Sequence, residues 1–193
     1  MGLGAGRENE FGASVENQGR REGRSWGGGS IRVVLDVGGG TASFAAQMAA
    51  YDVLVMTSGI NIEAPFLETI AQRGLIGLHM SHLQRLPLFD GTMDMIHSMH
   101  SVQYLKPDLF KSLIFDWDRC LRPGGLLWLE YLYLPAEKMG AYEDILEMMG
   151  YEKLEWFMET YFDKPRSKDM KRLSVLLEKP LNRNMKRDVS KGA

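Results

Sequence analysis

Short apolar runs alternate with segments of helical periodicity between residues 31 and 180. This alternation is typical of βαβ units, in which a helix crosses over between two parallel strands. The apolar runs predict strands at residues 31–35, 52–56, 75–80, 93–97 and 126–130. The periodic segments predict helices at residues 41–50, 62–73, 107–121 and 136–149.

The pattern changes after Gly150, where the last of these helices is expected to end. Glycine is common just past a helix C-terminus because it adopts the left-handed conformation without strain. Residues 153–161 and 172–178 then form two strand-like runs, joined by a short polar segment with no helical pattern. Such a connection favours antiparallel pairing, since a parallel crossover needs a longer one. We therefore expect an α/β fold whose parallel sheet ends in an antiparallel hairpin.

The two ends of the chain differ from this domain. Residues 1–30 are rich in glycine and charged residues and contain few large apolar side chains. Such a segment buries too little apolar surface to offset its ordering entropy, so we predict a disordered N-terminal tail. Residues 181–193 form a second, mildly basic tail. The prediction is thus one domain over residues 31–180 between two tails.

Composition narrows the class of protein. The chain has 193 residues, 45% of them hydrophobic, and a formal net charge of -2, so no overall field attracts nucleic acid. No apolar run approaches the roughly 20 residues that span a bilayer, and no signal-peptide core is present. These features predict a soluble, cytoplasmic chain. Cys120 is the only cysteine, which excludes an internal disulfide and a four-thiolate zinc site, and no metal site is expected.

A glycine cluster, Gly38-Gly39-Gly40, follows the first predicted strand and opens the first helix. At such a position, backbone N–H groups and the positive end of the helix favour a polar ligand. Glycine also lets a ligand touch bare backbone. In a dinucleotide fingerprint, a third glycine would stand where this chain has Ser43. The expected ribose-binding acid after the second strand is also missing, which disfavours a nicotinamide oxidoreductase.

The cluster resembles the first motif of class I S-adenosylmethionine-dependent methyltransferases. The motif is an acid followed by alternating glycines, matched by Asp36, Gly38, Gly40 and, imperfectly, Ala42. The closing hairpin is similar to the sheet edge of that family. The resemblance covers residues 31–180.

Two later motifs extend the resemblance. Residues 86–94, Leu-Pro-Leu-Phe-Asp-Gly-Thr-Met-Asp, are similar to the run that leads into strand four of the family. Residues 121–125, Leu-Arg-Pro-Gly-Gly, are similar to its turn into strand five. The sequence at residues 73–74, 84–87 and 115–119 is similar to that of a plant group of type 11-like methyltransferases of undefined substrate. Some members of that group carry a longer N-terminus with a membrane anchor.

The resemblance implies a Rossmann-like, seven-stranded mixed sheet of order 3-2-1-4-5-7-6, with strand seven antiparallel, covered by helices in three layers. It also implies S-adenosyl-L-methionine as the cofactor. Gly38, Gly39 and Gly40 would approach the amino-acid end of the cofactor, and Asp36 would receive its ammonium, directly or through water.

The acids that usually bind the ribose and the adenine in that family are absent here. Where strand two ends, Thr57 or Ser58 offers a hydroxyl instead. Beyond strand three, His82 and Gln84 would border the adenine, with Gln84 as the nearest possible acceptor. These are neutral partners and weaker than a carboxylate.

His97 and His100 follow strand four, toward which the reacting methyl group would point. Either could serve as a general base near neutral pH. The alternative is a structural or solvated histidine, because methyl transfer to an already nucleophilic atom needs mainly alignment. Tyr131, at the end of strand five, could line the substrate pocket or pack in the core.

The sequence thus predicts a methyltransferase acting on an unidentified small-molecule or polymer substituent. Its partners would be S-adenosylmethionine and this acceptor. Nucleic acid is disfavoured because no Asn/Asp-Pro-Pro-Tyr motif follows strand four. The alternative is a catalytically inactive or truncated methyltransferase-like binding module. The missing acids and the missing cap helices before strand one favour that alternative, and the glycine loop favours the enzyme.

Overall fold

The computed structural model describes residues 31–60, 63–81, 84–161 and 169–181. The predicted N-terminal tail at 1–30 lies outside these residues, as do His82 and all of the predicted C-terminal tail at 181–193 except Leu181. The strands are β1 Val33–Val37, β2 Leu54–Gly59, β3 Ile76–His79, β4 Met93–Met99, β5 Leu121–Pro135, β6 Glu152–Tyr161 and β7 Met170–Glu178. The helices are α2 Ser43–Met48, the short 3-10 helix η2 Ala49–Tyr51, α3 Phe66–Gln72, α4 Pro107–Cys120 and α5 Ala136–Met148.

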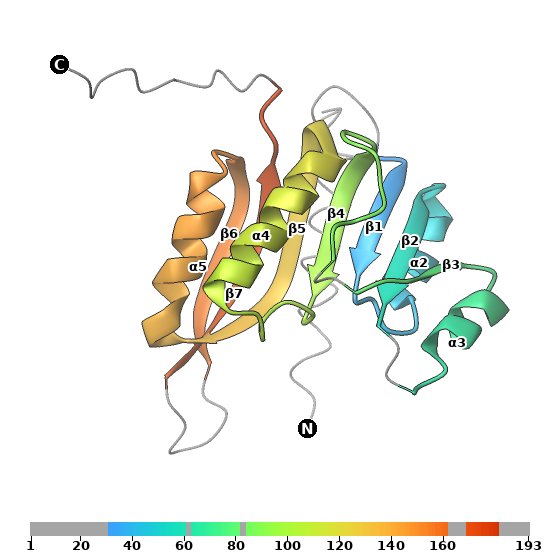
Figure 1. Cartoon of the computed structure of the whole chain (residues 1–193), viewed down its shortest axis with the longest axis horizontal. Coiled ribbons are helices and arrows are strands. Elements are labelled where there is room, and N and C mark those ends of the chain that lie inside the picture. Colours follow the sequence, from blue (N-terminus) through green and yellow to red (C-terminus); the bar gives the residue numbers. More distant parts are fainter. Residues whose placement is uncertain (1–30, 61–62, 82–83, 162–168, 182–193) are drawn as a thin grey trace.

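The strands form one sheet of order β3-β2-β1-β4-β5-β7-β6. β1 to β5 pair in parallel, whereas β7 pairs antiparallel with both β5 and β6. The order and the antiparallel hairpin implied by the methyltransferase resemblance are therefore confirmed. α4 and α5 cover the near face of the sheet, and α2 lies behind it (Figure 1).

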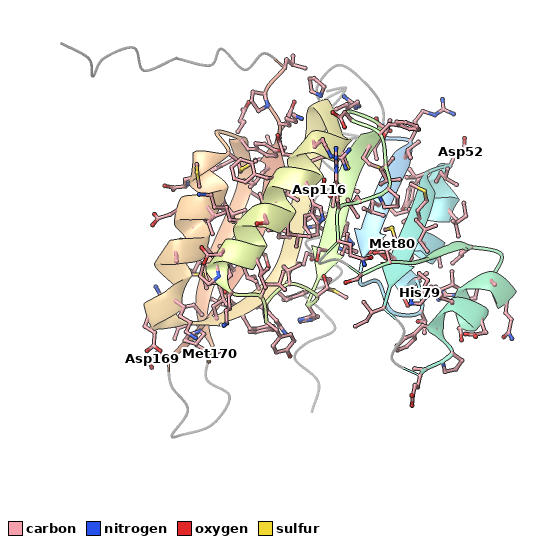
Figure 2. All side chains as sticks on the ribbon, viewed as in Figure 1. Asp52, His79, Met80, Asp116, Asp169 and Met170 are labelled. Carbon is pink, nitrogen blue, oxygen red and sulfur yellow. The ribbon has the colours of Figure 1, made fainter. Side chains whose placement is uncertain are left out.

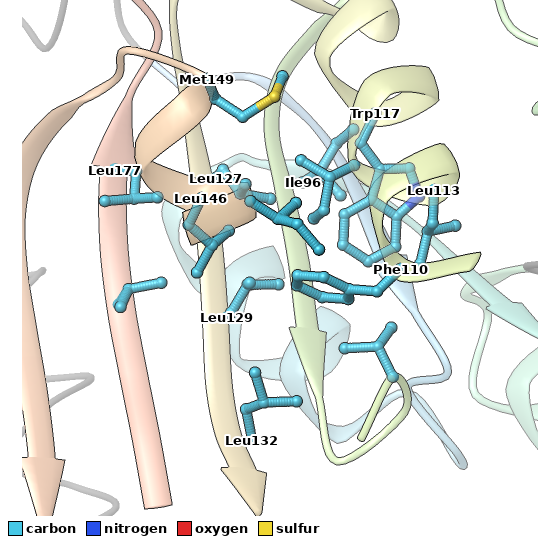
Figure 3. Close-up of a cluster of buried hydrophobic side chains, with 14 of the residues drawn as sticks. Ile96, Phe110, Leu113, Trp117, Leu127, Leu129, Leu132, Leu146, Met149 and Leu177 are labelled. Carbon is cyan, nitrogen blue, oxygen red and sulfur yellow. The ribbon is translucent and has the colours of Figure 1, made fainter. Parts of the chain in front are cut away.

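A large apolar core fills the space between the sheet and the helices α4 and α5 (Figure 3). α4 begins at Pro107, which fits the first turn because its missing N–H has no partner there anyway. Phe110, Ile114 and Trp117 lie on one face of α4 and are at most 1% exposed. They pack against the near-face side chains of β4 and β5, among them Ile96.

A second, smaller core lies on the opposite face of the sheet. It combines apolar side chains of the first strands with Ala45 of α2 and Ile70 of α3. Its members on β4 and β5 include Met95 and Trp128. This core holds the first helix against β1 and so fixes the loop between them.

Several elements differ from their predicted bounds, and β5 differs most. It begins at Leu121, which pairs with Met93 of β4, so the predicted turn at residues 122–125 belongs to the strand. It extends to Pro135 because Leu132 and Leu134 continue its apolar alternation after a register shift between Leu129 and Leu132. The helix predicted at residues 62–73 is the shorter α3, Phe66–Gln72. The first helix starts only at Ser43, because Ala42 has a left-handed backbone with φ 61°. It ends in a 3-10 turn before Asp52, whose φ is 59°.

Arg119 near the end of α4 explains the Leu-Pro-Leu-Phe-Asp motif. Its guanidinium donates to the carbonyl oxygens of Leu86 and Leu88 at 3.0 and 2.7 Å and pairs with Asp116 and Asp90. Asp116, marked on α4 in Figure 2, also accepts from the Leu86 N–H at 2.6 Å. The motif is therefore a segment clamped to α4.

Among the described residues, no helix combines the length and apolar character needed to cross a membrane. Cys120 is buried, and burial raises the pKa of its thiol to about 11. His79 lies at the end of β3, on the edge of the sheet (Figure 2). Neither residue belongs to the glycine-loop region described next.

Candidate active site

The glycine loop leaves β1 through a series of left-handed residues. Gly38 has φ +73° and Gly40 has φ +56°, values that side-chain-bearing residues rarely adopt. The N–H of Gly38 donates to the Ser58 carbonyl at 2.9 Å, and the N–H of Ala42 donates to the Gly39 carbonyl at 2.9 Å. The loop is thereby tied to β2 and turns tightly into α2.

The three glycines differ in what surrounds them. A Cβ at Gly39 would lie 1.8 Å from Asp36 Oδ2 and 2.7 Å from a methyl carbon of Thr57, so its backbone packs on the sheet. A Cβ at Gly38 would lie 2.5 Å from the Cβ of Ser101. At Gly40, by contrast, no described atom would lie within 4 Å. The loop therefore turns open backbone outward at Gly40, which fits a ligand held against the main chain.

Asp36 lies under this loop, inside the sheet. It is fully buried, and it is flanked by Thr57 on β2 and by His97 on β4 in the strand register. Its Oδ1 lies 2.9 Å from His97 Nδ1, and its Oδ2 accepts from the Thr57 hydroxyl at 3.3 Å. Both carboxylate oxygens therefore have partners within the protein. The predicted role of Asp36 at the cofactor ammonium stays a prediction.

His97 bridges two carboxylates. Its Nε2 lies 3.0 Å from Glu130 Oε2, and its side chain is 2% exposed. Phe44 of α2 stacks on the imidazole with ring centroids 4.1 Å apart. Burial lowers the pKa of His97, but hydrogen bonds and charge attraction from Asp36 and Glu130 outweigh it and raise this pKa to about 9.

His97 is therefore an imidazolium at neutral pH, one positive charge between two negative ones. A histidine that already carries its proton does not accept another, so the arrangement favours a positioning role. Its predicted role as a general base stays a prediction. This bridge was not predicted, since its members are 61 and 33 residues apart and meet only because β1, β4 and β5 are neighbours.

His100 lies just beyond β4 and is exposed. Its ring stacks on Tyr131, with centroids 5.0 Å apart, and on Tyr133, with centroids 5.6 Å apart. Both His100 and Tyr131 have left-handed backbones, with φ 57° and 54°. Their backbones are linked through Glu130, whose carbonyl accepts from the His100 N–H at 3.2 Å. Two strained residues side by side at the carboxyl end of a parallel sheet are a typical mark of a functional site.

Arg172 of β7 completes this aromatic group. Its guanidinium carbon lies 5.0 Å from the centre of the Tyr131 ring, and its NH2 group lies 2.6 Å from Glu159 Oε1. The sequence did not point to Arg172, because only the pairing of β7 with β5 places it opposite Tyr133.

The residues expected at the ribose and the adenine are placed differently. Thr57 and Ser58 are buried, and both hydroxyls donate to Asp36, one to its side chain and one to its carbonyl oxygen. Gln84 is exposed beyond β3, and its N–H donates to the Ser81 carbonyl at 3.2 Å. The roles of these residues at the ribose and the adenine stay predictions.

Two serines at the end of β4 were not predicted. The hydroxyls of Ser98 and Ser101 are hydrogen-bonded to each other, and Ser101 packs on Gly38. The segment after β4 thus supports the glycine loop directly.

Solved structures with this fold include S-adenosylmethionine-dependent methyltransferases. A putative sarcosine dimethylglycine methyltransferase from Galdieria sulphuraria has a TM-score of 0.67 and 16% identity, over 91% of this chain and 86% of that protein. A SAM-dependent methyltransferase from Methanosarcina mazei has a TM-score of 0.58 and 16% identity, over 79% of this chain and 94% of that protein. At such identities the similarity shows the fold alone.

Relatives in sequence come from Arabidopsis thaliana. One probable methyltransferase is 37% identical over 155 residues, which is 79% of this chain and 40% of the relative. The probable methyltransferase PMT9 is 36% identical over 101 residues, 51% of this chain and 16% of that relative. The chain thus spans less than half the length of these proteins. The family described as "Putative S-adenosyl-L-methionine-dependent methyltransferase" matches residues 7–175, and the chain belongs to that family.

Proposed function

We propose that this chain binds S-adenosyl-L-methionine on the glycine loop and catalyses methyl transfer to an acceptor at the carboxyl ends of β4 and β5. The observation that carries the proposal is the open backbone at Gly40, beside a loop that is closely packed at Gly38 and Gly39. Family membership supports the identity of the cofactor.

On the cofactor side, Gly38 to Gly40 hold the amino-acid end through backbone contacts. Asp36 supports them from below, because its carboxylate lies against the Gly39 backbone. Thr57 and Ser58, which end the buried part of β2, lie in the same region through their bonds to Asp36. Gln84 and His82 border the adenine in this proposal.

On the acceptor side, the ring of His100 is exposed and held by Tyr131 and Tyr133. The strained backbones of His100 and Tyr131 fix the direction of these rings. We place the acceptor next to His100, which touches it and, for an acceptor that loses a proton, receives that proton.

The cofactor supplies an activated methyl group when bound. The work of the chain is then to align donor and acceptor and to exclude water, and alignment alone contributes a large part of such rate enhancements. The rigid packing of the segment after β4 on the glycine loop, through Ser101 and Gly38, joins the two sides of the site.

The test is calorimetric titration with S-adenosylmethionine and S-adenosylhomocysteine. We expect binding by the wild-type chain and none by Gly40→Val, because valine strains the left-handed backbone and fills the open space. Gly140→Val is the matched control, since a Cβ at Gly140 on α5 also meets no described atom within 4 Å. It should bind as the wild type does.

A folded wild-type chain that gives no heat and no thermal shift with millimolar S-adenosylhomocysteine would contradict the proposal. Normal binding by a folded Gly40→Val variant would move the cofactor away from this loop.

A further inference from the structure

Three ionisable side chains form a line across the sheet, on β1, β4 and β5. Asp36 and His97 are enclosed, with side chains 1% and 2% exposed, whereas the side chain of Glu130 is 11% exposed. With His97 positive and both carboxylates negative, the line carries one net negative charge. Its open end is Glu130.

Glu130 lies where the two sides of the proposed site meet. It is opposite Met99, the last residue of β4, and its carbonyl accepts from the His100 N–H. At the other end of the line, Asp36 lies against the Gly39 backbone. One imidazole ring therefore separates Glu130 from the carboxylate under the glycine loop.

The carboxylate of Glu130 has a definite orientation. His97 is the only side chain in the described part of the protein that bonds it, and it does so through Oε2. The ring of His97 is itself fixed by Phe44 on one side and Asp36 on the other. The position of Oε1 is therefore fixed through His97, and no side chain among the described residues hydrogen-bonds to this oxygen.

A largely buried carboxylate beside a cofactor site recognises positive charge. S-adenosylmethionine carries a sulfonium, whereas its product S-adenosylhomocysteine carries a neutral thioether at the same place. We propose, on the basis of the function proposed above, that Glu130 is a cofactor-recognition residue that favours the sulfonium form over the thioether, and that His97 is the positioning residue that holds it.

The physical consequence is discrimination between substrate and product. Asp36 contributes little to it, because it is enclosed under the Gly39 backbone, whereas Glu130 lies at the more exposed end of the line. Glu130 should favour the sulfonium by roughly tenfold, the size expected of a single partly screened charge pair. A site that holds its product less tightly than its substrate releases that product more readily.

The experiment measures the dissociation constants of both ligands by calorimetry, with no methyl acceptor present. In Glu130→Gln we expect the preference for S-adenosylmethionine over S-adenosylhomocysteine to fall about tenfold, while the affinity for S-adenosylhomocysteine stays nearly constant. Glu147→Gln removes the same charge from exposed Glu147 on α5, which pairs with Lys153 at 2.7 Å. That control should keep the wild-type preference.

An unchanged preference in folded Glu130→Gln would overturn the role of Glu130. An equal loss of affinity for both ligands would also overturn it, since the residue would then support the site as a whole. Failure of the wild type to bind either ligand would overturn the proposed function itself, so the two failures are distinguishable. Omitting the acceptor ensures that a positively charged acceptor cannot produce the effect.

The role of His97 has its own readout. In the ligand-free wild type at pH 7, ¹⁵N chemical shifts should show both ring nitrogens of His97 protonated. His97→Gln should change the preference while Glu130 is present, and should leave it unchanged in the Glu130→Gln background, because His97 acts through Glu130. A neutral His97 ring at pH 7, or a folded His97→Gln chain with the full preference, would overturn its positioning role.

Discussion

The backbone of Gly39 lies directly on the carboxylate of Asp36, so closely that a Cβ at Gly39 would fall 1.8 Å from Asp36 Oδ2. The first motif of the chain is therefore a packed unit. Its acid is covered by its own middle glycine, and only the next glycine has open space beside it. Glycine is required at position 39 for a steric reason, and the requirement concerns the stability of the fold.

Gly39→Ala tests this contact. We expect the free energy of unfolding to fall by at least about 1–3 kcal/mol, because the methyl group has no room and the buried carboxylate cannot leave. Urea denaturation measures this change. Gly140→Ala is the control on an open helical position and should stabilise the chain by about 0.5–1 kcal/mol. Equal stability of Gly39→Ala and wild type would show that the loop is not packed as described.

The imidazolium of His97 predicts how stability varies with pH. The pKa of this group is raised in the folded chain, to about 9 from an ordinary 6.5, so its stabilisation is fully present below about pH 6.5. It is lost as the pH rises toward 9. The difference corresponds to roughly 3 kcal/mol.

Urea unfolding between pH 6 and pH 9 measures this loss. His97→Gln is the comparison, and its stability should change less over the same range. The carboxylates that face the imidazole are Asp36 from β1 and Glu130 from β5. Stability of the wild type that is constant or rises up to pH 9 would contradict the bridge.

Much of the fold could be predicted from the sequence because the patterns that mark strands and helices are local. Apolar runs marked each strand of the parallel sheet, and Gly150 marked the end of α5. Strand bounds were less accessible. The extension of β5 past Glu130 depends on a register shift and on pairing with residues of β7 that are at least 35 positions away in the chain. The order of the strands came from the resemblance, since periodicity carries no information about neighbours.

The site could be predicted only in part, because the sequence pattern does not show which strands are neighbours. Asp36 and the glycines are contiguous and could be found, and His97 and His100 stood out as titratable residues after a strand. Their partners could not be found. Glu130 meets His97, and Arg172 meets Tyr131, only through the order of the sheet.

The contacts of Arg119 should stabilise the segment that leads into β4. Arg119→Lys keeps the charge but loses the planar fork that reaches Leu86, Leu88 and Asp116 together. We expect a stability loss of about 1–3 kcal/mol and faster hydrogen exchange at the Leu86 amide. Arg85→Lys is the control, because Arg85 is 75% exposed and lies 3.9 Å from Asp116, so it should change little. Slow exchange in Arg119→Lys would show that the clamp is not needed.

The proposed role of His100 at the acceptor can be tested by substitution. His100→Asn keeps a residue that tolerates the left-handed backbone but removes the stacked ring. We expect kcat to fall by ~10²–10⁴-fold, with the affinity for S-adenosylmethionine unchanged. Transfer of a radiolabelled methyl group to fractionated small-molecule and polymeric acceptors measures turnover. His79→Asn, at the edge of the sheet, should behave as the wild type does. Unchanged turnover in His100→Asn would leave alignment as the mechanism.

Asp36→Asn separates support of the site from contact with the cofactor. The substitution keeps the shape of the side chain and removes its charge, which leaves the buried imidazolium with Glu130 alone. Breaking a buried ion pair from one side costs about 3–5 kcal/mol, so we expect a large loss of stability and a lower pKa for His97. Urea denaturation and an NMR titration of His97 measure these changes.

The effect on binding distinguishes the two roles of Asp36. Both of its oxygens are bonded within the protein, so the affinity for S-adenosylhomocysteine should fall by less than about threefold where the variant is folded. A direct bond to the cofactor ammonium would instead make the loss about tenfold to a hundredfold. Titration at a temperature well below the melting point of the variant decides between them. A loss of that larger size with little change in stability would place Asp36 on the ligand, as its position in the methyltransferase motif implies.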